Sequence, residues 1–225
     1  MSEKIPRFVQ RITYWPTYLL LKLLFHYQIA GQENLKGLEK KGVIFVSNHT
    51  SLIDGPLCAA AMPREGLTPK NFFPVKFLAA KEYCEWFNPR GFFFPLRIFT
   101  TPYAKLNGCI PVNRKRDGGT LEERLEPAIK VLRAGAKVWI YPEGHITKDG
   151  KLQFGKKGAA FLQQATGCPI VPVGLIGTFK ILSAKSLLGR KTHAKTKIGQ
   201  PFFLPESISL EESTKIIMQK IAQLL

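Results

Sequence analysis

The sequence predicts a single α/β domain in which a mainly parallel central sheet is flanked by helices, and three observations support this fold class. The chain has 225 residues, of which 45% are apolar, so it can build one domain with a substantial core. From Val43 onward, short β-branched apolar runs alternate with segments of helical pattern. Polar residues follow several of these runs directly, as they do at the strand ends of open α/β sheets.

The predicted elements follow one another in this alternating order. Short apolar or alternating runs predict strands at residues 43–47, 75–79, 109–112, 137–141, 170–174 and 192–199. Amphipathic or capped segments predict helices at residues 52–61, 120–135, 156–166 and 209–224, with a helical turn at 81–87. A capping box, Thr120 with Glu123, opens the second helix, and Gly167 ends the third. Pro172 indicates that the strand at 170–174 lies at an edge or carries a bulge.

The first 30 residues are predicted to form an amphipathic, membrane-associating helix ahead of a domain at residues 31–225. Phe8 to Tyr27 is rich in leucine and aromatic residues and also carries cationic side chains. Pro16 and Lys22 interrupt the apolar run, so no clean stretch of about 20 apolar residues is available to cross a bilayer. A single tilted span and a helix packed on the domain are the alternatives.

The charge balance indicates an anionic partner. Lys and Arg number 33 against 16 Asp and Glu, a net charge of +17. The Phe-rich segments Phe72-Phe73-Pro74 and Phe92-Phe93-Phe94-Pro95 favour a lipid surface over nucleic acid. The four cysteines are scattered with no CxxC pair, so neither a metal site nor a disulfide framework is expected.

The most informative motif is His49 followed five positions later by Asp54. Residues five apart on one helix point in different directions, so the two can meet only if His49 lies in a turn and Asp54 in the first turn of the next helix. A carboxylate that fixes the imidazole tautomer makes histidine a general base. The pair is therefore a candidate catalytic site, although a lone loop histidine is often only solvated.

Three further motifs follow predicted strands. Gly108–Arg114 delivers an arginine just past a strand end, where its guanidinium can hold a phosphate. Tyr141–Thr147 places Glu143 at a rigid Pro-Glu-Gly turn, where an acid can bind a polyol hydroxyl or a cation. Ile170–Gly174, taken alone, predicts only a strand.

Together, in this order and spacing, the four motifs resemble the glycerolipid acyltransferase family, best represented by 1-acylglycerol-3-phosphate acyltransferases. The resemblance covers roughly residues 40–200. It implies transfer of a fatty acyl group from an acyl thioester, acyl-CoA or acyl carrier protein, to a hydroxyl of a lysophosphatidate-like acceptor in phospholipid biosynthesis. It also implies action on membrane lipids at the cytoplasmic face of the inner or plasma membrane, with no other cofactor.

The resemblance also implies roles for individual residues. His49 would take the proton of the acceptor hydroxyl and Asp54 would orient it. Arg114 would bind the acceptor phosphate with help from Lys81. The acceptor site would be shaped by the motif residues Glu143, Gly144 and Thr147.

The chain departs from the family at one position. Ile146 stands where the family commonly has an arginine that contacts phosphate, so Arg114, Lys81 or His145 compensates, or the acceptor is not a simple lysophosphatidate. Glycerol 3-phosphate, a lyso-phospholipid and a lyso-aminolipid are the alternative acceptors. A basic membrane-binding module without catalysis is a rival, and a serine hydrolase using Ser47 or Ser51 ranks last because the chain has no Gly-x-Ser-x-Gly elbow.

Overall fold

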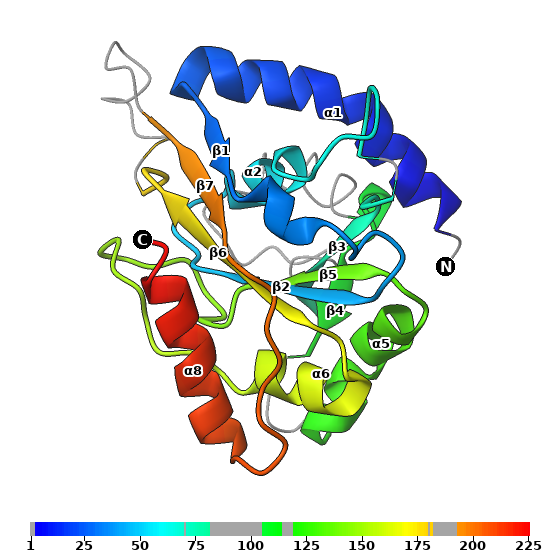
Figure 1. Ribbon diagram of the computed structural model, residues 1–225, viewed down its shortest axis with the longest axis vertical. Coiled ribbons are helices and arrows are strands. Elements are labelled where there is room, and N and C mark those ends of the chain that lie inside the picture. The colour runs from blue at the N-terminus through cyan, green and yellow to red at the C-terminus, as the bar shows by residue number, and fades with distance from the viewer. Residues whose placement is uncertain (1–2, 70, 82–104, 114–118, 180, 182–192) are drawn as a thin grey trace.

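The computed structural model describes residues 3–69, 71–81, 105–113, 119–179, 181 and 193–225. They form one seven-stranded sheet with helices on both faces, which confirms the predicted α/β class (Figure 1). The strands are β1 Gln28–Ala30, β2 Val43–Ser47, β3 Val75–Ala80, β4 Ile110–Val112, β5 Lys137–Ile140, β6 Ile170–Ile176 and β7 Lys195–Ile198. The helices are α1 Lys4–Phe25, the 3-10 turn η1 Gln32–Leu35, α2 Asp54–Ala60, α5 Leu121–Arg133, α6 Gly158–Thr166 and α8 Leu210–Ala222.

The sheet is mainly parallel, in the order β1-β7-β6-β2-β5-β3-β4. The five strands from β6 to β4 all run the same way, and only β7 pairs antiparallel, with β6. The carboxyl ends of β2, β3, β4, β5 and β6 therefore meet at one edge of the sheet. Polar residues that follow these strands are brought together there.

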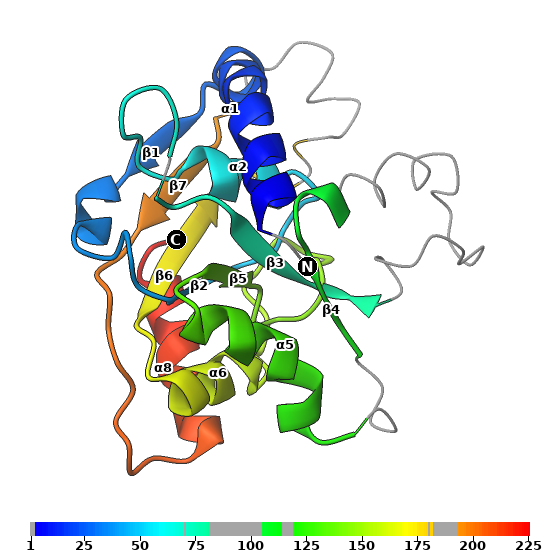
Figure 2. The ribbon, with the colours of Figure 1, turned by 90° about the vertical axis from the view of Figure 1, so that its right-hand side faces the viewer.

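Helices cover the two faces of the sheet as separate layers (Figures 1 and 2). Successive residues of β2 face opposite layers, so Ile44 packs in the core with α5, α6 and α8, whereas Phe45 packs in the core that receives α1. Every residue of β2 is buried. A strand covered on both faces requires the continuous apolar run that the sequence shows at this position.

The predicted elements agree with the structure to within a few residues at most ends. The predicted strand 43–47 has the observed bounds, and Thr120 and Glu123 form both bonds of the capping box. α6 begins at Gly158 rather than at Lys156, and the Lys156 amide donates to the Pro142 carbonyl at 2.8 Å. Apart from Lys81, the predicted turn at 81–87 lies outside the described residues, as does most of the connection 88–107.

Of the two alternatives predicted for Pro172, the edge position is wrong, whereas a bulge agrees with a one-residue shift in pairing between Ile170–Phe202 and Val173–Ile198. β6, which contains Pro172, lies inside the sheet between β2 and β7 rather than at an edge. The Pro172 carbonyl accepts from the Gly199 amide at 2.8 Å, on the side of β6 away from β2. The missing N–H faces that same side, so the pairing of β6 with β2 loses no hydrogen bond.

α1 is anchored to the domain along one side and apolar along the other. The Gln10 side chain donates to the carbonyls of Val75 and Asn107 at 2.9 and 3.0 Å and accepts from the Val75 amide at 2.9 Å. Tyr14 and Leu21 are buried on the same side. The opposite side carries large apolar residues that are 45–78% exposed: Ile5, Phe8, Ile12, Leu19, Leu20, Leu23 and Leu24. Among the described residues, no helix is both long enough and apolar enough to pass through a bilayer.

Candidate active site

The side chain of Asn48 fixes the turn after β2, because it forms the hydrogen bonds that the backbone of a further strand residue would form. The side-chain Nδ2 of Asn48 donates to the Leu175 carbonyl, and its Oδ1 accepts from the Leu175 N–H, both at 2.8 Å. Asn48 thereby extends the pairing of β2 with β6 by one residue beyond Ser47. The chain enters the turn in a defined direction, and His49 is its next residue.

His49 and Asp54 meet as the sequence predicts. Asp54 is the first residue of α2, and its Oδ2 lies 2.9 Å from the Nδ1 atom of His49. The same oxygen accepts from the amides of Thr50 and Ser51 at 2.7 and 2.9 Å. The Asp54 side chain is fully buried, whereas that of His49 is 20% exposed. Backbone amides thus hold the buried carboxylate in place, while the imidazole remains partly exposed to solvent.

This arrangement defines how the imidazole is protonated. Oδ2 is an acceptor for three N–H groups, so a neutral His49 carries its hydrogen on Nδ1. Its Nε2 then presents a lone pair away from Asp54, and the buried carboxylate stabilises the imidazolium formed when that lone pair takes a proton. An imidazole held in this way can act as a general base.

Glu143 holds the backbone of His49. Its Oε1 accepts from the His49 amide at 2.7 Å, and its Oε2 accepts from the Gln153 amide at 2.8 Å. Glu143 is 1% exposed, and this burial raises the pKa of its carboxyl. The Thr147 amide donates to the His49 carbonyl at 2.9 Å, so both backbone polar groups of His49 are hydrogen-bonded. The predicted substrate-binding residues Glu143 and Thr147 therefore lie behind the histidine, where they position it.

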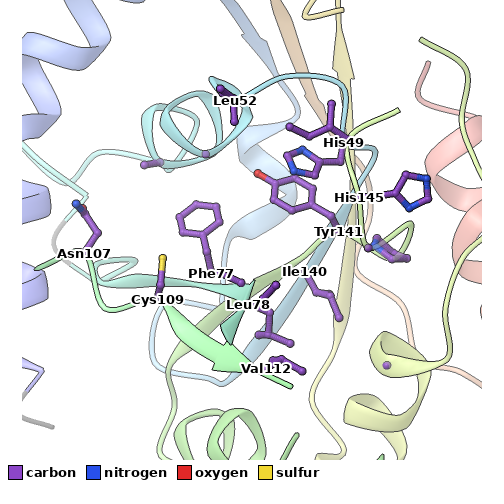
Figure 3. A pocket seen from close by; sticks show the side chains of 18 of the residues that line it. His49, Leu52, Phe77, Leu78, Asn107, Cys109, Val112, Ile140, Tyr141 and His145 are labelled. Atoms are coloured by element: carbon purple, nitrogen blue, oxygen red, sulfur yellow. The ribbon is translucent and has the colours of Figure 1, made fainter. Parts of the chain in front are cut away.

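Tyr141 supports the imidazole from below, a contact that sequence reasoning missed. Its ring stacks on the His49 ring at 3.9 Å between centroids and 11° between planes (Figure 3). Burial raises the pKa of Tyr141 well above its usual value, so the ring stays neutral. Its hydroxyl lies 3.7 Å from the buried Sγ of Cys58, which fixes the far end of the ring. The only signal in the sequence is that Tyr141 ends a buried strand directly before Pro142.

A cavity of about 1040 Å³ opens at this edge of the sheet, and His49 forms part of its wall. Most of its described lining is apolar or aromatic, with contributions from α1, α2, β3, β4 and α5. Figure 3 shows Phe77, Leu78, Val112 and Ile140 along the side of the cavity beyond Tyr141. The cavity thus places the His49 imidazole beside an apolar chamber.

The remaining predicted site residues are Gly144, Lys81 and Arg114. Gly144 lines the cavity. Lys81 is exposed and directly follows β3, whose last residue, Ala80, is a lining residue. Arg114 lies outside the described residues, but the lining includes Asn113, the residue before it.

The described residues give no support to a serine hydrolase that uses Ser47 or to a metal site. Ser47 is fully buried, and its hydroxyl accepts from the Trp139 indole at 2.8 Å, so it is not presented to a substrate. Within the described ranges, no three His, Cys, Asp or Glu side chains gather as they would around a metal ion.

Fold and site together define a three-layer α/β protein with a His–Asp pair on the wall of an apolar cavity. The chain belongs to the Acyltransferase family, whose model matches residues 26–176. This confirms the resemblance that the sequence motifs indicated.

Named relatives agree with this family. The chain is 38% identical over 162 residues to the chloroplastic 1-acyl-sn-glycerol-3-phosphate acyltransferase BAT2 of Brassica napus, covering 70% of this chain and 39% of the relative. It is 29% identical over 135 residues to the human 1-acyl-sn-glycerol-3-phosphate acyltransferase beta, covering 60% of this chain and 41% of the relative. The chain thus spans about two-fifths of the length of these curated relatives.

The fold also matches a solved structure. The 1-acyl-sn-glycerophosphate acyltransferase PlsC of Thermotoga maritima superposes with a TM-score of 0.64 at 21% identity, covering 99% of this chain and 82% of that one. At this level of identity the match extends to the fold alone.

Proposed function

We propose that the protein transfers a fatty acyl group from an acyl thioester to a hydroxyl of a lysophosphatidate-like acceptor in phospholipid biosynthesis. One observation carries the proposal: the Nδ1 atom of His49 lies 2.9 Å from Oδ2 of the buried Asp54 on the wall of a large apolar cavity. Acyl transfer to an alcohol needs both parts, a base for the hydroxyl proton and a dry chamber for the acyl chain.

In the proposed reaction, Nε2 of His49 takes the proton of the acceptor hydroxyl while Asp54 stabilises the imidazolium. The hydroxyl oxygen attacks the thioester carbonyl, forming an acyl–oxygen bond. The tetrahedral intermediate breaks its carbon–sulfur bond, and the thiolate leaves with the proton that His49 returns. The thiol is that of coenzyme A or acyl carrier protein, and no other cofactor takes part.

We further propose that residues 1–30 associate with the membrane and residues 31–225 form the acyltransferase domain. The support is the exposed apolar side of α1, together with its cationic residues Lys4, Arg7, Arg11 and Lys22. Leucine and aromatic side chains with nearby lysine and arginine are typical of helices that lie at the headgroup level of anionic bilayers. The expected location is the cytoplasmic face of the inner or plasma membrane, without a nucleic-acid partner.

A different acceptor is the second candidate. Ile146 lines the cavity and carries no charge at the position where the family commonly has arginine. Glycerol 3-phosphate, a lyso-phospholipid and a lyso-aminolipid are therefore tested beside lysophosphatidate.

The decisive experiment is an acyl-transfer assay on vesicles with the wild type and His49→Ala across this acceptor panel. Loss of the general base is expected to lower turnover by about 10²- to 10⁴-fold while vesicle binding stays unchanged. The matched control is His193→Ala, since His193 is exposed and is not among the described residues that line the cavity. A basic membrane module without catalysis predicts no turnover by the wild type on any acceptor.

A further inference from the structure

The charged side chains that face the cavity all have the same sign. Among the described residues that line it, the charged ones are Arg124, Lys156 and Lys157, and none is Asp or Glu. Cations that share an apolar-walled cavity without a carboxylate raise the local concentration of anions. The cavity is therefore suited to a ligand that combines an apolar part with a negative group.

Among the described residues, Lys157 has a carboxylate partner, and Arg124 uses one of its N–H donors on a backbone carbonyl. Lys157 forms an ion pair with Glu211 at the start of α8, and the Arg124 guanidinium donates to the Thr120 carbonyl at 3.3 Å. Like Arg124, the Lys156 ammonium has no carboxylate partner within the described part of the chain, and it lies beside the turn that holds His49. Its charge is available to a ligand.

Lys156 is held beside the turn that fixes His49. Its amide donates to the Pro142 carbonyl at 2.8 Å, so its backbone is tied to the Pro-Glu-Gly turn. Its side chain crosses Gly144: a Cβ at Gly144 would lie 2.8 Å from the Lys156 Nζ and 3.1 Å from its Cδ. The absence of a side chain at Gly144 leaves the room that the ammonium occupies. Through Glu143, the same turn holds the His49 amide at 2.7 Å.

We propose that Lys156 binds a phosphate group of a substrate at the cavity wall beside His49. The inference rests on the proposed acyl transfer and names the residue that receives the charge of one reactant. Both reactants can carry such a group: the acceptor as a phosphate monoester, and the donor as the phosphates of coenzyme A or of a phosphopantetheine arm. An ammonium is a compact donor for phosphate oxygens. Binding there would place the reactant against the general base.

The experiment compares Lys156→Ala with the wild type and with Lys130→Ala, an exposed lysine of α5 that pairs with Glu126 and is not a described lining residue. Each enzyme is assayed with palmitoyl-CoA and lysophosphatidate, with monoacylglycerol replacing lysophosphatidate, and with palmitoyl-pantetheine replacing palmitoyl-CoA. Lys156→Ala is expected to lower kcat/KM by roughly 10- to 100-fold for the phosphate-bearing reactant, and Lys130→Ala by less than about threefold. The loss should disappear when the phosphate that Lys156 binds is absent from the substrate.

A rescue variant distinguishes the effect of the lost charge from the effect of the lost side-chain volume. Ile146 also lines the cavity, so Ile146→Arg in the Lys156→Ala background returns a cation to it and should recover part of kcat/KM. A loss confined to lysophosphatidate assigns Lys156 to the acceptor, and one confined to palmitoyl-CoA assigns it to the donor. Equal kcat/KM for Lys156→Ala and wild type on all substrates overturns the inference while acyl transfer stands. Absence of turnover in the wild type overturns the proposed function itself.

Discussion

Replacing Asp54 by Asn tests the site most directly, because it removes one charge and almost no volume. The amide oxygen can take the place of Oδ2 and still accept from the amides of Thr50 and Ser51 and from Nδ1 of His49. The amide nitrogen then occupies the place of Oδ1, which is buried without a hydrogen-bond partner among the described residues. The opposite orientation sets an NH₂ group against three N–H donors and is excluded.

The magnitude follows from the charge that is lost. At about 4 Å between charge centres and an effective dielectric constant of about 20, the imidazolium–carboxylate attraction is about 4 kcal/mol. Full loss of that attraction in the transition state equals about a thousandfold in rate, and loss of half of it about thirtyfold. We expect kcat of Asp54→Asn to fall within this range. Weaker hydrogen bonds to the buried oxygen should also lower stability by about 1–2 kcal/mol, or roughly 2–8 °C in Tm.

The assay is steady-state acyl transfer well below the Tm of the variant, with thermal unfolding followed in parallel. Asp149→Asn is the matched control: that exposed carboxylate also accepts local hydrogen bonds, from Thr147 and Lys151, but Asp149 is not a described lining residue. It should retain turnover within about twofold. If Asp54→Asn keeps kcat within threefold of the wild type in a folded protein, the carboxylate does not support a general base.

Two further predictions concern stability and the membrane. Burial lowers the pKa of Lys137 from 10.5 to about 8, so the folded state releases this proton first and stability rises with pH between these values. Denaturant unfolding at pH 7.5 and pH 10 should show the wild type gaining up to about 3 kcal/mol relative to Lys137→Met, and a constant difference would exclude a desolvated ammonium. Combined Leu19→Ser and Leu23→Ser should weaken binding to anionic vesicles by at least about tenfold, because each leucine leaves the lipid interface. Phe203→Ser, 63% exposed but outside α1, is the control and should bind like the wild type; equal binding of the leucine variant would remove this side of α1 from the membrane interface.

The sequence predicted the parts of the fold in which local pattern and burial agree. β2 is covered on both faces, so its apolar run gives its bounds, and the capping box of α5 satisfies its own backbone groups. β1 was missed because it has only three residues and pairs with β7, which lies far along the chain. The edge position predicted for Pro172 was wrong because the effect of proline depends on which side of β6 the missing N–H faces, and that is set by the neighbouring strands.

The candidate site likewise combines local contacts that the sequence pattern predicts with long-range contacts that it does not. The five-residue interval between His49 and Asp54 fixes a contact across a single turn, so the sequence contains it. The roles of Glu143 and Thr147 depend on contacts with a turn about 94 residues earlier, and no local pattern reports them. The stack of Tyr141 on His49 likewise arises because β2 and β5 are neighbours in the sheet.

These long-range contacts explain why the Pro-Glu-Gly turn lies opposite the histidine. β2 and β5 pair in parallel, so the segments that follow them emerge side by side at one edge of the sheet. The turn after β5 then gives His49 a stacking ring from Tyr141, a backbone acceptor from Glu143 and, through Gly144, a passage for the Lys156 ammonium. A substitution at Gly144 therefore acts on the cavity charge, whereas one at Glu143 acts on the base, although the two residues are adjacent. Substitution of Gly144 should therefore change KM for the phosphate-bearing reactant, and substitution of Glu143 should change kcat.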